Sequence, residues 1–203
     1  MMKEKNIIIT AQILSLVFTP FYLPLVGLAS LFFFSYMSVL PLVYKIVILL
    51  MVYLFTILLP TLLIRLYRYY QGWTQFELGK KERRAVPYII SILCYFACLY
   101  IMECRNVPRY ITIVLVSALL IQMVCAIVNI KWKVSIHTAA IGGITGALMA
   151  FAEIFAFNPI WWLCVLLMLS GIVGTCRMIL RQHTLAEVCG GFAIGFIVAY
   201  VII

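Results

Sequence analysis

Long apolar runs, separated by short polar junctions, make up most of this 203-residue sequence. A helix needs about 20 apolar residues to cross the hydrocarbon core of a bilayer, and several of the runs reach that length. Inside lipid, every backbone polar group must find its partner within the protein, so such runs fold as helices. We therefore expect an all-α, polytopic membrane helix bundle with six to seven transmembrane helices, over the runs 7–34, 40–64, 88–102, 111–130, 138–157, 160–175 and 184–203.

The first run leaves the number of spans open. Pro20 and Pro24 lie in its middle, and proline breaks or kinks a helix because it has no N–H to donate. The run either kinks or folds as a re-entrant hairpin, which gives seven or six spans. Its apolar stretch is too long for a signal peptide and has no clear cleavage site, so we expect it to be retained.

The composition places the chain in lipid and limits its partners. Hydrophobic residues make up 67% of the sequence and charged residues only 10%, far from the balance of a soluble domain. The net charge of +9 is attributed to membrane interfaces, since there is no soluble basic domain to bind nucleic acid. Membrane lipids are thus expected partners and nucleic acid is not, while the oligomeric state stays open. The seven cysteines are scattered through apolar runs and are expected to be small buried hydrophobes, neither disulfides nor metal ligands.

Alternation of the spans brings the polar junctions together. The junctions 65–87, 131–137 and 177–187 are separated by two spans each, so we expect all three on one face of the membrane. Inside the spans, Glu153 is either a proton or ion site or a helix–helix hydrogen bond. Two glycine pairs have the spacing of close helix packing: Gly142 with Gly146, and Gly191 with Gly195.

His183 has the neighbours that a nucleophilic imidazole needs. Glu187 follows it by four residues, which places both side chains on the same face of a helix. A carboxylate that accepts the Nδ1 proton fixes the tautomer and leaves Nε2 free to attack. Arg177 supplies a forked donor that suits a phosphate group. Such a group of charged residues beside a bilayer is a candidate functional site.

The other histidine of the sequence, His137, lies near the start of a predicted helix, where unpaired N–H groups favour an anion. Ser135 either caps that helix or donates a hydrogen bond to the same anion. The cations of segment 80–84 are equally consistent with interfacial anchors and with phosphate ligands. Other junction cations are interpreted as interfacial anchors: Lys131, Lys133 and Arg181.

These residues resemble the type 2 phosphatidic acid phosphatase family, the membrane branch of the acid phosphatase and vanadium haloperoxidase superfamily. That family carries K-x6-R-P, then P-S-G-H, then S-R-x5-H-x3-D. The third motif here reads C-R-x5-H-x3-E over 176–187, and the second reads V-S-I-H over 134–137. The first offers the residue types without the spacing, in Lys80, Lys81, Arg83, Arg84 and Pro87. The resemblance covers residues 65–203, the expected catalytic transmembrane core, after N-terminal transmembrane helices in 1–64.

The resemblance implies an enzyme, a phosphoric monoester hydrolase that acts on lipid phosphates without a metal or another cofactor. His183 would attack phosphorus and form a phosphohistidine, and Glu187 would orient it. His137 would protonate the leaving alkoxide and then activate water. The phosphate-binding residues would be Arg177, Ser135, Lys80, Lys81 and Arg84.

Two alternatives stay open at this stage. Ile136 stands where the family has glycine, so a catalytically weak or dead relative that binds anionic lipids is one. A lipid phosphotransferase, with an alcohol in place of water as acceptor, is the other. We expect an integral, multi-pass protein of a bacterial cytoplasmic membrane. The positive-inside rule favours the cytoplasmic face for the site, although the same cations also suit a phosphate.

Overall fold

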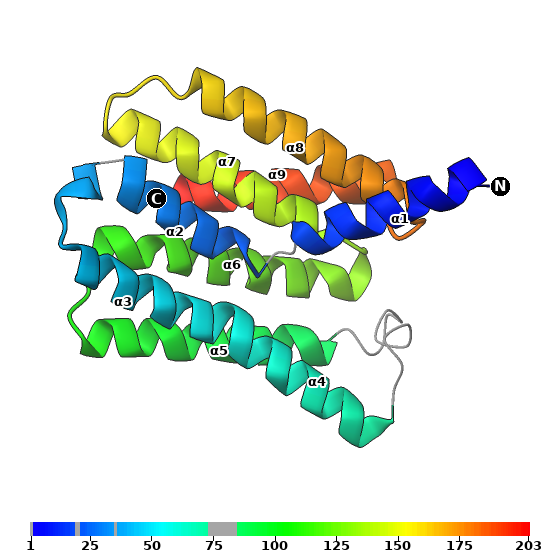
Figure 1. The fold of residues 1–203 in the computed structure, drawn as a ribbon, viewed down its shortest axis with the longest axis horizontal. Helices are drawn as coiled ribbons and strands as arrows, with labels where there is room; N and C mark the ends of the chain where they lie inside the picture. The colour runs from blue at the N-terminus through cyan, green and yellow to red at the C-terminus, as the bar shows by residue number, and fades with distance from the viewer. Residues whose placement is uncertain (1, 19–20, 35, 73–84) are drawn as a thin grey trace. The chain divides into compact units, whose positions relative to one another are not determined.

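A computed structural model describes residues 2–18, 21–34, 36–72 and 85–203, which fold into helices and connecting turns (Figure 1). No strand occurs in these ranges. The helices are α1 (Met2–Val17), α2 (Leu23–Phe34), η1 (Tyr36–Val39), α3 (Leu42–Tyr53), η2 (Leu54–Leu58), α4 (Leu59–Gln71), α5 (Ala85–Cys104), α6 (Arg109–Lys131), α7 (Ile136–Ile154), α8 (Ile160–Ile179) and α9 (Leu185–Ile202).

Six helical segments in the described ranges are long and apolar enough to cross a membrane. They are Leu42–Gln71, Val86–Cys104, Arg109–Lys131, Ile136–Ile154, Ile160–Ile179 and Leu185–Ile202. This confirms the prediction of an all-α, polytopic membrane protein with several transmembrane helices.

The first apolar run is broken into two helices and is not one continuous span. Helix α1 ends at Val17 and α2 begins at Leu23. Pro24 lies in the first turn of α2, where a missing N–H costs nothing because that group has no partner within the helix. With 12 residues, α2 is about 18 Å long, well short of the hydrocarbon core.

The second run continues farther than its hydropathy predicts. Helices α3 and α4 are joined through η2, a π-helical segment that precedes Pro60. A π turn accommodates proline by widening the helix locally. Helix α4 then extends seven residues beyond the predicted end at 64, with Tyr69 and Tyr70 exposed, because its last turns are amphipathic. It stops at Gly72, whose φ of +64° is left-handed.

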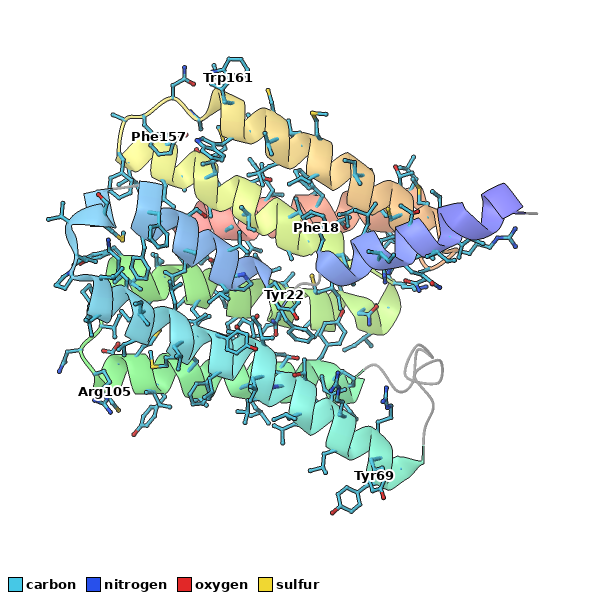
Figure 2. The ribbon with its side chains drawn as sticks, viewed as in Figure 1. Phe18, Tyr22, Tyr69, Arg105, Phe157 and Trp161 are labelled. Carbon is cyan, nitrogen blue, oxygen red and sulfur yellow. The ribbon has the colours of Figure 1, made fainter. Side chains whose placement is uncertain are left out.

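The chain forms two compact units, Met1–Leu23 with Val116–Ile203, and Pro24–Leu115. The division predicted from the sequence, 1–64 and 65–203, concerned function and stays a prediction. The first unit holds both histidines, and it includes α1 from the far end of the chain. In it α1 packs against α8, and Figure 1 shows α1 beside the C-terminal end of that helix. Phe18, labelled in Figure 2, packs against the buried side chains of Ile141 and Val173.

Helices α7 and α9 approach until their backbones touch, through the two predicted glycine pairs. A Cβ atom at Gly195 would lie 1.8 Å from the carbonyl oxygen of Ala139, and one at Gly142 would lie 2.1 Å from that of Phe192. Gly146 and Gly191 are equally crowded. The predicted packing role of these glycines is confirmed.

The opposite end of the same helix pair is joined by side chains. The hydroxyl of Tyr200 on α9 donates a hydrogen bond of 2.8 Å to the Oε1 atom of Glu153 on α7. Of the two interpretations of Glu153, the helix–helix hydrogen bond is the one observed. Figure 2 shows Phe157 and Trp161 at the turn between α7 and α8, on this same end.

All seven cysteines are free, as predicted. The expectation that they are buried holds for Cys94, Cys98, Cys125 and Cys176. It is wrong for Cys104, Cys164 and Cys189, which are exposed. In a membrane-spanning bundle the outer helix faces contact lipid, so a small apolar side chain is stable there without burial in protein.

Candidate active site

The polar junctions 131–137 and 177–187 are joined to each other by hydrogen bonds. The backbone N–H of Ser135 donates to the carbonyl of Glu187 at 3.2 Å. The hydroxyl of Thr138 donates to the carbonyl of Val188 at 2.9 Å. The convergence predicted for the junctions 131–137 and 177–187 is thus observed. Most of the third junction, residues 73–84, lies outside the described residues.

A tight reversal after α8 places His183 close to the end of that helix. The N–H of Gln182 donates to the carbonyl of Arg177 at 3.1 Å, and the N–H of Arg181 donates to that of Met178 at 2.9 Å. Arg181 takes a left-handed conformation with φ of +52°. These are the features of a Schellman motif, which here has arginine where glycine is usual. Arg177 and His183 are therefore held on either side of one short turn.

The predicted pairing of His183 with Glu187 is present. The Nδ1 atom of His183 lies 2.9 Å from Oε2 of Glu187, and the two side chains are only 6% and 14% exposed. A carboxylate can only accept a hydrogen bond, so Nδ1 carries the proton and donates it. In the neutral ring the other nitrogen, Nε2, then has a free lone pair.

Glu187 also stabilises the first turn of α9, the helix that carries it. Its Oε2 atom accepts the backbone N–H of Thr184 at 3.3 Å, and its own N–H donates to the Thr184 hydroxyl at 3.4 Å. This reciprocal pair is a capping box at the start of α9. One side chain thus fixes both the first turn of α9 and the imidazole beside it.

The His183 ring is held in its neutral form. Burial lowers the pKa of His183 below its usual value, and the positive charges of Arg177 and Lys133 act in the same direction. The hydrogen bond to Glu187 acts against them, but burial is the largest effect. At neutral pH the imidazole is therefore uncharged, with Nε2 unprotonated.

Arg177 and His137 share a partner that the sequence analysis does not include. The Nη1 atom of Arg177 donates a hydrogen bond of 2.8 Å to the hydroxyl of Ser15 on α1. The His137 ring interacts with the backbone of the same residue, and it lies within electrostatic range of Arg177 and His183. Ser15 is only 7% exposed. The apolar run 7–34 contains a second serine, Ser30, so no signal in the sequence singles out Ser15.

Ser135 occupies the N-cap position of α7 without capping it. Its side chain makes no hydrogen bond to the backbone of the helix. Its Oγ atom is fully buried and has no hydrogen-bond partner among the described residues. Of the two roles predicted for Ser135, the capping of α7 is not observed. The hydroxyl is therefore available to a ligand at this point of the site, and buried polar atoms of native proteins normally have a partner.

The remaining predicted phosphate ligands lie outside the described residues: Lys80, Lys81 and Arg84. Their role stays a prediction. Within the ranges that the structure describes, no group of three His, Cys, Asp or Glu side chains is arranged to hold a metal ion.

The chain matches no family model, no curated protein and no solved structure. The chemistry of the site is therefore inferred from the residues that form it. An imidazole with a free Nε2 lone pair lies in a cluster that also contains a guanidinium, a second imidazole and a buried hydroxyl. This combination can bind an anion and attack it as a nucleophile.

Proposed function

We propose that this protein is an integral-membrane lipid phosphate phosphatase that works through a phosphohistidine. The substrate is a phosphomonoester or a pyrophosphate of a lipid. The observation that carries the proposal is the 2.9 Å hydrogen bond from Nδ1 of His183 to Glu187. That bond leaves Nε2 as the reactive atom, in a junction between two apolar helices that are each long enough to span a membrane.

In the first step, Nε2 of His183 attacks phosphorus and a nitrogen–phosphorus bond forms. The bond from phosphorus to the lipid oxygen breaks, and His137, which is an imidazolium when the dianionic substrate is bound, gives its proton to the departing oxygen. Glu187 keeps its hydrogen bond to Nδ1 and stabilises the positive charge that develops on the ring.

In the second step, water attacks the phosphohistidine. His137 takes the proton from that water, the nitrogen–phosphorus bond breaks, and inorganic phosphate leaves. His183 returns to its neutral form, so the two steps together consume one water and need no other reactant.

The phosphoryl oxygens are held by Arg177, and by Ser135 through its buried hydroxyl. A planar guanidinium donates two parallel hydrogen bonds to a phosphate. To do so, Arg177 exchanges its bond to Ser15 for a bond to the ligand. Lys80 or Lys81, together with Arg84, would add positive charge from the third junction.

The substrate follows from the location of the site. His183 lies between two helices that are apolar along their length, so a phosphate attached to a lipid reaches it from the headgroup layer. The excess of lysine and arginine in the junctions supports a site on the cytoplasmic face of the membrane, which we take to be a bacterial cytoplasmic membrane.

The proposal is tested by measuring phosphate release from purified protein in detergent with a chelator present. Phosphatidate, phosphatidylglycerophosphate and isoprenyl mono- and diphosphates form the substrate panel. We expect turnover of at least one of them, and less than about 1% of that rate in His183→Ala, since removal of a nucleophile costs several orders of magnitude. Gln182→Ala, next to the nucleophile and exposed, is the matched control and should keep its rate.

The outcomes separate the alternatives. Phospholipid binding with no turnover across the panel would favour a catalytically dead lipid-binding protein. Phosphodiester products, formed when acceptor alcohols are added, would favour a phosphotransferase. Full turnover by His183→Ala would exclude the phosphohistidine mechanism.

A further inference from the structure

The charges around His183 leave a phosphate dianion short of positive partners. A phosphomonoester carries about −1.5 to −2 charges near neutral pH. Among the residues joined at the site, the guanidinium of Arg177 is balanced by the carboxylate of Glu187. His183 itself is neutral. Together these three groups have no net positive charge, and the proton that His137 carries in the proposed mechanism adds one charge, which is fewer than a dianion needs.

Lys133 is the described cation best placed to supply that charge. Its Nζ atom donates a hydrogen bond to the carbonyl of Gln182, the residue before His183. Lys133 thus reaches from the 131–137 junction to the chain beside the nucleophile.

The neighbouring cations do not share this position. Lys131 and Arg181 are exposed. The positive groups in the described residues whose charge acts on the His183 ring are Arg177 and Lys133. From the sequence, Lys133 was expected to be an interfacial anchor; in the structure it is hydrogen-bonded to the turn that carries His183.

We infer that Lys133 is a phosphate-binding residue, and that with Arg177 it selects the doubly charged terminal phosphate of a lipid over a singly charged phosphodiester. This inference rests on the proposed function. Lys133 and Arg177 belong to different junctions, and the buried hydroxyl of Ser135 lies two residues after Lys133 in the chain. The compact charge of lysine suits a role as a charge partner, while arginine supplies the directed hydrogen bonds.

The test uses variants that separate charge from structure. Lys133→Gln removes the charge but keeps an N–H group that can donate to the carbonyl of Gln182. Lys133→Arg keeps the charge. Lys131→Gln removes an equal charge two residues earlier, from an exposed side chain, and is the matched control.

Two measurements are made on full-length protein in detergent. The first is the affinity for inorganic phosphate, and for a short-chain phosphatidate as substrate. We expect Lys133→Gln to weaken both about tenfold, a magnitude typical of one charged hydrogen bond, with Lys133→Arg and Lys131→Gln within about twofold of the parent. The second is an NMR titration of ¹⁵N-labelled histidine. Loss of a nearby positive charge should raise the pKa of His183 in Lys133→Gln and leave it unchanged in Lys131→Gln.

The two measurements distinguish a failure of the proposed function from a failure of the inference about Lys133. If the parent protein neither binds phosphate nor turns over any lipid phosphate, the proposed function fails, whatever the pKa of His183 does. If the parent binds phosphate and Lys133→Gln binds it equally well, the inference about Lys133 is wrong and the proposed function stands. Equal losses in Lys133→Gln and Lys133→Arg would also overturn it, because they would show that the lysine acts through the fold and not through its charge.

Discussion

The carboxylate of Glu187 accepts two hydrogen bonds on one oxygen, from Nδ1 of His183 at 2.9 Å and from the backbone N–H of Thr184 at 3.3 Å. The first turn of α9 and the orientation of the imidazole therefore depend on the same atom. Because the capping box forms from the local chain alone, the nucleophile is positioned as soon as α9 begins. The contact between His183 and Glu187 thus depends on neighbouring residues of the chain.

Glu187→Gln should separate these two functions of the carboxylate. Glutamine at the third position of a helix also completes a capping box, so we expect the melting temperature to change by only a few degrees. The amide cannot stabilise a positive ring as a carboxylate does, so kcat should fall about 100-fold. Phosphate release and circular dichroism melts measure the two effects. Glu153→Gln is the matched control, since that carboxylate bonds to Tyr200 at the other end of α7. An unchanged kcat in Glu187→Gln would remove the orienting role.

The protonation of His183 gives a second prediction, on pH dependence. Its pKa is lowered by burial in the folded protein, whereas in the unfolded chain it lies near 6.5. At a pH between the pKa of His183 in the folded protein and its pKa in the unfolded chain, the unfolded chain binds a proton that the folded protein does not. The free energy of unfolding therefore falls as the pH drops below about 6.5. An NMR titration of ¹⁵N-labelled histidine should place the midpoint of His183 below 6.5. Assignment is direct, because the chain has two histidines and His183→Gln removes one signal.

The variant Glu187→Gln provides a further test in the same titration. The carboxylate favours the charged ring, so its removal should move the midpoint of His183 to still lower pH. A midpoint at or above 6.5 in the parent protein would mean that the ring is not neutral in the way the mechanism requires.

The long helices could be predicted from the sequence alone, because a run of apolar residues leaves no other stable structure in lipid. From α5 to α9, each observed end lies within four residues of its predicted position. The end of α4 was missed, because hydropathy falls along its amphipathic last turns while the helix continues. Pro20 and Pro24 predicted an interruption of the run 7–34, and α1 and α2 are indeed separate helices.

The site could be predicted where it depends on local spacing. His183 and Glu187 are four residues apart near a helix start, so their contact follows from helix geometry. Ser15 could not be predicted in this way, because its contact with Arg177 spans 162 positions of the chain. It depends on the packing of Phe18 against Ile141 and Val173, which no periodicity in the sequence reveals.

The buried hydroxyl of Ser135 gives a third prediction. Ser135→Ala removes an Oγ atom that has no partner in the described structure, so we expect stability to stay unchanged or to rise by up to about 1 kcal/mol. If the hydroxyl donates to phosphate, kcat/KM should nevertheless fall about tenfold. Thr138→Val is the control. Its hydroxyl donates to the carbonyl of Val188, so that variant should lose about 1 kcal/mol of stability. A Ser135→Ala protein that is destabilised and fully active would show a structural role instead.

The contact between α7 and α9 gives a fourth prediction. In Gly195→Ala the new Cβ atom would lie 1.8 Å from the backbone oxygen of Ala139, and a backbone atom cannot move aside as a side chain does. The helices must separate, at a cost of about 3 kcal/mol, and the bonds that join Ser135 and Thr138 to α9 should weaken with them. Gly171→Ala is the control, because a Cβ atom there meets nothing within 4 Å. Thermal melts should show a large loss only for Gly195→Ala, and equal melts would contradict the observed packing.

The central claim, that His183 carries the phosphoryl group during turnover, is tested most directly by trapping the intermediate. The protein is mixed with ³²P-labelled lipid phosphate, quenched within milliseconds, and the labelled peptide is identified by mass spectrometry. The phosphohistidine mechanism predicts an acid-labile, alkali-stable phosphoryl group on His183 that is absent from His183→Ala. Continued release of phosphate with the label on another residue, or with turnover intact in His183→Ala, would contradict it.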